Sequence, residues 1–290
     1  MIVWGAIAPH GGISLDGSER LREAMRELGR RCKTAAPEAL VVLTPHGVHV
    51  EGHLAVVTAG MLAGQVEDEA LTVETDRPLA DAILLELRAD GIPALAISCG
   101  SNAPEHAEHP LDWGALVPLW YLPRLPVVVV SPARDLSLSE HVRAGAAIAR
   151  APGRHALVAS ADHAHTHTEG GPYHVDAESA RAYDDAVVAL VQENRLAGLL
   201  ELGAAAERGL ADSLWQLLVL HGALGVGFSA ALLAYEAPSY FGMLCASFEP
   251  VAPASSAIVP QSATRSESAT GSEVASARKP IAGGPTRNAV

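Results

Sequence analysis

Short hydrophobic runs alternate along the chain with longer segments in which hydrophobic positions recur every three or four residues. Seven of the runs are nearly uninterrupted and are bounded by Gly, Pro or charged residues, a pattern typical of strands buried in a sheet. We predict these strands at residues 1–9, 38–45, 53–60, 92–98, 126–132, 155–162 and 242–250.

The segments between the runs have the hydrophobic period of amphipathic helices. Each has Asp, Ser or Glu near its start, and several end near Gly, as helix caps commonly do. The alternation predicts an α/β fold: a single domain with a central, mostly parallel or mixed sheet covered by helices. The predicted helices lie at 18–32, 76–91, 138–153, 177–194 and 211–225.

The composition changes near residue 251. From there the chain is rich in Ser, Ala, Thr, Pro and Gly and contains no aromatic residue. Such a segment cannot bury enough apolar surface to offset the entropy lost on ordering. We therefore expect one folded domain over residues 1–250 and a disordered tail over 251–290.

The charge of the chain narrows the classes of partner that we expect it to bind. The formal net charge is −13, and the only lysines are Lys33 and Lys279, so we expect no nucleic acid and no anionic membrane as a partner. No hydrophobic run is long enough to span a bilayer, and the start lacks a basic leader, which predicts a cytoplasmic protein. Three scattered cysteines argue against a disulfide framework or a structural zinc site.

Histidines gather where predicted strands end. His10 and His46 each stand in a Pro-His-Gly sequence directly after a strand, and a third strand ends at Asp162, followed by His163 and His165. In open α/β sheets, ligands bind beyond the carboxyl ends of the strands. We therefore predict that these strand ends share a metal or catalytic site.

A metal site of this kind needs a carboxylate. Glu236 precedes the final strand in a segment punctuated by Pro and Gly, whereas Glu249 follows that strand beside the tail, so we favour Glu236. Together with His10 and His46 it would form a set of two histidines and one carboxylate. Such a set leaves coordination positions open and suits non-haem Fe(II) working with O2.

Several motifs, in this order along the chain, resemble those of the class III extradiol ring-cleavage dioxygenases. This is the catalytic-subunit superfamily that includes protocatechuate 4,5-dioxygenase and 2-aminophenol 1,6-dioxygenase. The resemblance spans residues 1–250 and identifies that segment as an extradiol-dioxygenase-like catalytic domain. The motifs are APHGG, TPHG, LDWGALVPLWYL, DHAH followed by GGPYH, and YEAPSYFGM.

The resemblance implies a reaction and assigns residues to it. Fe(II) would be held by His10, His46 and Glu236, and a small aromatic substrate of the catechol or 2-aminophenol type would react with O2. His165 would be the acid/base that takes a proton from the substrate and later returns one, with Asp162 shaping its loop. The ring would open beside, and not between, the two adjacent heteroatoms.

One position departs from the family pattern and bears on the substrate. Many members have a histidine after the Asp of the DHGxxVPL motif, where this chain has Trp113. His109 or His106 could supply that histidine, or Trp113 could instead wall the pocket and change the substrate. We expect four substrate-binding residues: Trp113, His109, His174 and Tyr240.

Two other functions use the same features. The His/Glu set could hold Zn²⁺ and activate water for hydrolysis, although no HExxH motif is present. A non-enzymatic member of the superfamily could retain the fold and act as a binding protein. The resemblance also leaves open self-association into a homo-oligomer or pairing with a small partner subunit.

Overall fold

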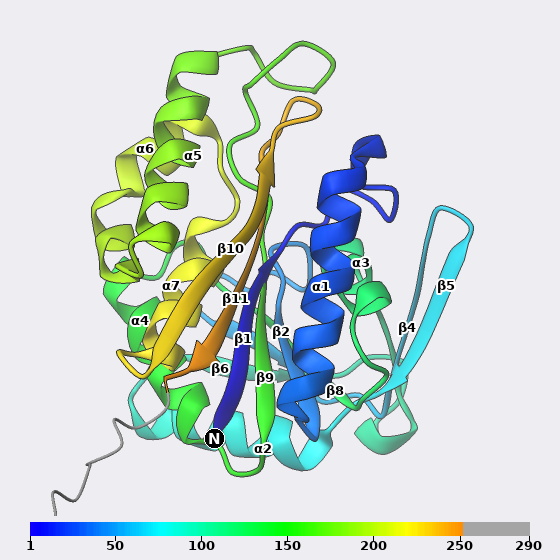
Figure 1. The fold of residues 1–290 in the computed structure, drawn as a ribbon. Coiled ribbons are helices and arrows are strands. Elements are labelled where there is room, and N and C mark those ends of the chain that lie inside the picture. Colours follow the sequence, from blue (N-terminus) through cyan, green and yellow to red (C-terminus); the bar gives the residue numbers. More distant parts are fainter. Residues whose placement is uncertain (252–290) are drawn as a thin grey trace, which may run out of the picture. The chain divides into compact units, whose positions relative to one another are not determined.

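The computed structural model describes residues 1–251, and an eight-stranded sheet forms its centre. The strand order is β10-β11-β1-β9-β2-β8-β3-β6 (Figure 1). The pairs β1–β9, β9–β2, β2–β8 and β3–β6 are parallel and the other three are antiparallel, so the sheet is mixed. The bounds are β1 Ile2–Ala8, β2 Ala39–Leu43, β3 Leu54–Val57, β6 Ala94–Ile97, β8 Val127–Ser131, β9 His155–Ser160, β10 Phe228–Glu236 and β11 Met243–Pro250.

Helices cover both faces of this sheet (Figure 1). Helices α1 and α3 pack on one face, and α2, α4, α5 and α7 pack on the other. Each face has its own core of buried apolar side chains. The helix bounds are α1 Glu19–Ala35, α2 Arg77–Ala89, α3 Trp113–Tyr121, α4 Leu138–Arg150, α5 Ala177–Gln192, α6 Gly203–Gly209 and α7 Leu214–Leu224, with short 3₁₀ turns at Leu15–Gly17, Pro104–His106 and Leu196–Glu201.

The predicted α/β class, with a mixed sheet covered by helices, is confirmed. Strands β2, β8 and β9 are buried along their whole length, which explains their continuous hydrophobic sequences. The prediction of a disordered tail lies outside the described residues except for Val251. None of the helices within residues 1–251 is long and apolar enough to cross a membrane.

Four strands and two helices, α3 and the seven-residue α6, were not predicted from the sequence. A second, three-stranded sheet has the order β5-β4-β7, with β4 at Met61–Val66, β5 at Glu69–Glu74 and β7 at Glu108–Pro110. Its strands are short and partly exposed, so their hydrophobic pattern is weak. The edge strand β10 is also mostly half-buried, and α3 contains Pro118.

The functional consequence of the fold lies in three adjacent parallel strands. Strands β1, β9 and β2 run side by side, and the register pairs Ala8 with Ser160 and Leu43 with Ala159. The residues that follow these strands therefore emerge at one edge of the sheet. His10, Asp162 and His46 all stand within three residues of these strand ends.

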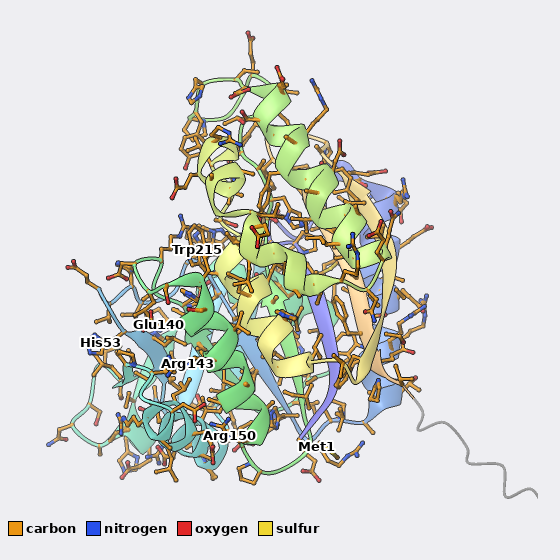
Figure 2. All side chains as sticks on the ribbon, turned by 90° about the vertical axis from the view of Figure 1, so that its left-hand side faces the viewer. Met1, His53, Glu140, Arg143, Arg150 and Trp215 are labelled. Carbon is orange, nitrogen blue, oxygen red and sulfur yellow. The ribbon has the colours of Figure 1, made fainter. Side chains whose placement is uncertain are left out.

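At the opposite end of β1 the chain start is tied to the turn between α4 and β9. The amino group of Met1 lies 2.9 Å from the carbonyl oxygen of Ala151 and also donates to Gly153 (Figure 2). Arg150 lies at the end of α4, and its Nε atom is 2.8 Å from Glu86 Oε2 in α2. This ion pair links the two helices. These contacts are partly exposed, so we expect each to contribute less than about 1 kcal/mol.

We expect His155, the first residue of β9, to make folding stability depend on pH. It is 1% exposed, and burial, aided by the nearby Met1 amino group, lowers its pKa to about 4. The unfolded chain binds this proton near pH 6.5 and the folded chain does not, so stability is lost as pH falls from about 6.5 to about 4. The loss is on the order of 3 kcal/mol.

Urea unfolding at pH 7, 5.5 and 4.5 measures this effect. The variant His155→Leu cannot bind the proton, so its free energy of unfolding should fall less steeply over that range than the wild type's. Other groups titrate in both proteins, and the difference between the two curves isolates His155. Parallel curves would contradict the assignment.

Candidate metal centre

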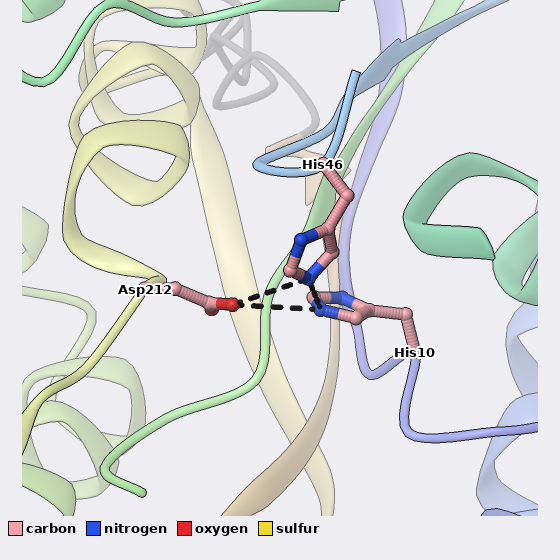
Figure 3. Close-up of side chains that lie close together, drawn as sticks. All are labelled: His10, His46 and Asp212. Carbon is pink, nitrogen blue, oxygen red and sulfur yellow. Dashed lines mark hydrogen bonds and ion pairs between the residues drawn. The ribbon is translucent and has the colours of Figure 1, made fainter. Parts of the chain in front are cut away.

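His10, His46 and Asp212 bring three potential metal-ligand atoms together beyond the sheet edge (Figure 3). The Nε2 atoms of the two histidines are 2.9 Å apart. The Asp212 Oδ2 atom lies 3.6 Å from His10 Nε2 and 3.4 Å from His46 Nε2. Three donor atoms from three distant parts of the chain thus face one point.

His10 is held by both its backbone and its ring. Its backbone N–H donates to Asp162 Oδ1 at 2.9 Å, and its Nδ1 lies 2.9 Å from Ser160 Oγ. The Ser160 hydroxyl donates to the Gly114 carbonyl, so its oxygen is free to accept from His10 Nδ1–H. The lone pair of His10 Nε2 then faces the cluster, as a metal ligand requires.

His46 is positioned by the start of α3. The ring of Trp113, the first residue of α3, stacks on His46 with centroids 4.1 Å apart and planes at 24°. Asp112 caps that helix by accepting from the backbone N–H of Ala115, and the same carboxylate accepts from Thr44 Oγ1 at 2.6 Å. The segment after β2 and the first turn of α3 are therefore connected beside His46.

Asp212 supplies the carboxylate, and the sequence analysis missed this role. It precedes α7, a helix with buried residues on every side, so its start lies inside the molecule. We interpreted the acidic residue at this position as an ordinary part of a helix start. The available signal was the apolar character of α7 all round, because a carboxylate at the start of a fully buried helix needs a partner.

Glu236, the carboxylate that we predicted for this role, is not brought to the two histidines. It is the last residue of β10 and pairs with Met243 of β11, and this hairpin directs it toward the start of α1. There its Oε2 accepts from Ser18 Oγ at 2.5 Å, and its Oε1 lies 3.7 Å from Arg20 Nη1. In the cluster, Asp212 and not Glu236 occupies the carboxylate position.

The cluster has an excess of negative charge around its imidazoles. Burial opposes a charge on His10, but Asp162 and Asp212 outweigh it and raise its pKa to about 9. Burial likewise opposes ionisation of Asp212, yet the neighbouring His10 and His46 imidazoles hold its pKa well below the usual range. The site therefore favours a bound cation, and a metal ion would replace the proton on His10.

The donor set fits a metal ion. Metal–ligand bonds of about 2.0–2.2 Å at angles of 90–110° place neighbouring ligand atoms about 2.8–3.6 Å apart. The three observed separations, from 2.9 to 3.6 Å, fall in this range. Two imidazole nitrogens this close need a proton or a shared cation between them, because their lone pairs otherwise repel.

His165 lies in the loop after β9, among aromatic rings. Its ring stacks on Phe241 with centroids 5.5 Å apart and lies 5.9 Å from the ring of Tyr240. Its Nδ1 is 3.0 Å from the Leu210 carbonyl oxygen, an acceptor, so Nδ1 carries a proton and Nε2 is left to exchange one. Leu210 is two residues from Asp212, which links the His165 loop to the metal cluster.

The other histidines of this loop have separate surroundings. His163 is fully buried and its Nδ1 lies 3.1 Å from Ser213 Oγ. His167 donates from Nε2 to Asp184 at 2.8 Å, and the same carboxylate accepts from the backbone N–H of Ala164, so it anchors the loop on α5. His174 is exposed.

The remaining residues predicted to bind substrate are spread around the site. Trp113 is 50% exposed over His46, and Tyr240 packs beside His165. His109 is buried on β7 and lines a cavity that His46 also lines. His106 ends a 3₁₀ turn and is exposed, and is not among the residues lining that cavity.

The fold and this donor set define an α/β protein with three potential metal ligands beyond the carboxyl ends of its parallel strands. Residues 8–243 match the model of the family described as the catalytic LigB subunit of aromatic ring-opening dioxygenase. The match covers most of the chain and includes His10, His46, His165 and Asp212, and the chain belongs to this family.

No curated protein matches the chain. Among solved structures, the uncharacterized protein JW3007 from Escherichia coli K12 is similar, with a TM-score of 0.55 and 16% sequence identity. The similarity covers 84% of this chain and 99% of that protein. At this identity it supports the fold alone.

Proposed function

We propose that this protein is an Fe(II)-dependent extradiol dioxygenase that opens the ring of a catechol- or 2-aminophenol-type substrate with O2. The convergence of His10 Nε2, His46 Nε2 and Asp212 Oδ2 carries the proposal. Membership in a family of aromatic ring-opening dioxygenases supports it. The substrate is a small aromatic molecule with two adjacent heteroatoms.

His10, His46 and Asp212 would hold the metal. Two neutral imidazoles and one carboxylate on one side leave positions open, the arrangement typical of non-haem Fe(II) sites that work with O2. When bound, Fe(II) supplies the redox chemistry that joins an electron-rich ring and O2, which no side chain provides. The residues of this chain hold and orient the reactants.

His165 is the residue placed to move protons. With Nδ1–H directed at the Leu210 carbonyl, its Nε2 accepts a proton from a substrate hydroxyl or amine and later returns it. The rings of Tyr173, Tyr240 and Phe241 pack around it and orient its plane. The Asp162 carboxylate accepts a hydrogen bond from the backbone N–H of His10 and so positions that metal ligand.

Metal analysis and oxygen uptake test the proposal together. Protein purified without oxygen and reconstituted with Fe(II) should bind one iron per chain. It should consume O2 with a catechol or 2-aminophenol and release a yellow ring-opened product, followed by absorbance. Stoichiometric zinc in the purified protein, with no O2 uptake after iron reconstitution, would instead favour a hydrolase, and failure to bind any metal would favour a binding protein.

A further inference from the structure

A cavity of about 500 Å³ lies beside His46 and contains features that the proposed reaction does not use. Its walls include the apolar side chains of Val48, Ile97 and Pro110. His46 is shared between this cavity and the metal cluster. The volume is within the usual range of small-molecule sites and exceeds the needs of an unsubstituted ring.

Two polar side chains in this cavity form a pair. His109 is 7% exposed and is fixed on β7 by the pairing of that strand with Leu62 of β4. Its Nδ1 lies 3.5 Å from the thiol sulfur of Cys99, which follows β6. When the thiol donates to Nδ1, the Nε2 atom carries the remaining proton.

No hydrogen-bond partner for this Nε2 atom is found within residues 1–251. The Nε2 atom keeps some exposure to solvent, so a ligand oxygen in the cavity can replace water as its acceptor. His109 thus offers one directed donor in an otherwise mainly apolar wall. This combination is typical of a pocket that selects a small molecule by shape and by a single polar contact.

The charges around the cavity restrict that ligand. Neither lysine nor arginine is among the described residues that line it, and the Asp112 carboxylate is part of its wall. Burial lowers the pKa of His109 despite the neighbouring Asp112, so its ring is neutral near pH 7. An anionic group placed here would be desolvated beside a carboxylate without a compensating cation.

We infer that this cavity receives the ring substituent of the aromatic substrate, and that it selects uncharged substituents over carboxylates, with His109 as the polar contact. The inference rests on the proposed function, since it names the substrate class of the same site. It favours alkyl- or hydroxyalkyl-substituted catechols and aminophenols over dihydroxybenzoates.

Cys99 provides a readout that does not require turnover. It is exposed, whereas Cys32 and Cys245 are buried, so a thiol reagent should modify one cysteine per folded chain. The probes are 4-methylcatechol and 3,4-dihydroxybenzoate, each added without oxygen to the Fe(II)-loaded protein. Labelling by iodoacetamide is then followed by mass spectrometry.

We expect 4-methylcatechol to slow Cys99 labelling about tenfold when its concentration is ten times its dissociation constant. The same concentration of 3,4-dihydroxybenzoate should slow labelling less than about twofold. Equal protection by the two compounds, or stronger protection by the carboxylate, would overturn the inference. Absence of protection by either compound would overturn it as well.

Two pairs of variants sharpen the test. Val48→Arg adds a cation to the wall and should gain protection by 3,4-dihydroxybenzoate, whereas the matched Val48→Leu should not. His109→Leu removes the donor and should weaken the protection of Cys99 by a hydroxyalkyl-substituted catechol. His109→Gln keeps an N–H donor and should retain more of that protection. Unchanged protection in both members of a pair would contradict the role given to that residue.

The outcomes separate this inference from the proposed function. If O2 uptake occurs with dihydroxybenzoates as well as with uncharged catechols, the dioxygenase proposal stands and the selectivity inference fails. If no diol or aminophenol gives O2 uptake in Fe(II)-loaded protein, the proposed function fails, whatever the labelling shows.

Discussion

Asp212→Ala is expected to weaken Fe(II) binding by roughly 100-fold or more, whereas Glu236→Ala should bind Fe(II) as the wild type does. Loss of a partner that merely orients a ligand already costs 10–100-fold in metal affinity, and Asp212 offers a ligand atom directly. Glu236 contacts Ser18 and Arg20 instead of the two histidines. Iron titration under anaerobic conditions measures both affinities.

Folding has to be checked separately, because Asp212 is 5% exposed and its replacement changes the interior. Thermal unfolding of the metal-free proteins shows whether Asp212→Ala still folds, and Asp212→Asn keeps the volume of the side chain while removing its charge. Both variants should remain folded and bind iron weakly. Iron loss in Glu236→Ala together with retention in Asp212→Ala would reverse our assignment of the carboxylate.

His165→Phe is expected to retain iron and to lose turnover by about 10²–10⁴-fold, the usual contribution of a general acid/base. Phenylalanine keeps an aromatic ring against Tyr240 and Phe241 but removes both ring nitrogens. The variant should therefore fold, hold metal and bind substrate, but it should not accept the substrate's proton. Single-turnover kinetics with iron content measured on the same sample tests this expectation.

His53→Phe serves as the matched control, since it removes a histidine that directly precedes β3 (Figure 2), contacts the Glu51 carbonyl oxygen and is not part of the metal cluster. Its turnover should stay within about twofold of the wild type. If His165→Phe turned over substrate at the wild-type rate, His165 would have no part in the proton transfer. Loss of iron in that variant would instead indicate a structural role for the loop.

The sequence predicted the part of the site that depends on strand ends. His10 and His46 follow hydrophobic runs that predict buried strands, and both stand in Pro-His-Gly sequences. Parallel strands present their carboxyl ends at one edge, so their convergence could be foreseen from the chain alone. The His165 segment follows from the same reasoning, because β9 lies between β1 and β2.

The carboxylate could not be chosen in this way. Glu236 was favoured because it stands near a strand, but its direction depends on the register of β10 with β11, which pairs it with Met243. Asp212 reaches the histidines because α7 packs in the interior and places its first residues beside them. The apolar character of α7 indicates that this helix is buried, but neither the register of β10 nor the position of Asp212 beside the two histidines is contained in a local pattern.

The α/β class, the two histidines of the cluster and the order of the family motifs could all be predicted from the amino-acid sequence, since they depend on local hydrophobic period and on residues at strand ends. The carboxylate that joins His10 and His46, and the cavity that His109 and Cys99 share with His46, become visible only in the folded molecule. The reason is physical: contacts between residues far apart in the chain depend on strand order, register and helix packing, which minimise the free energy of the whole molecule.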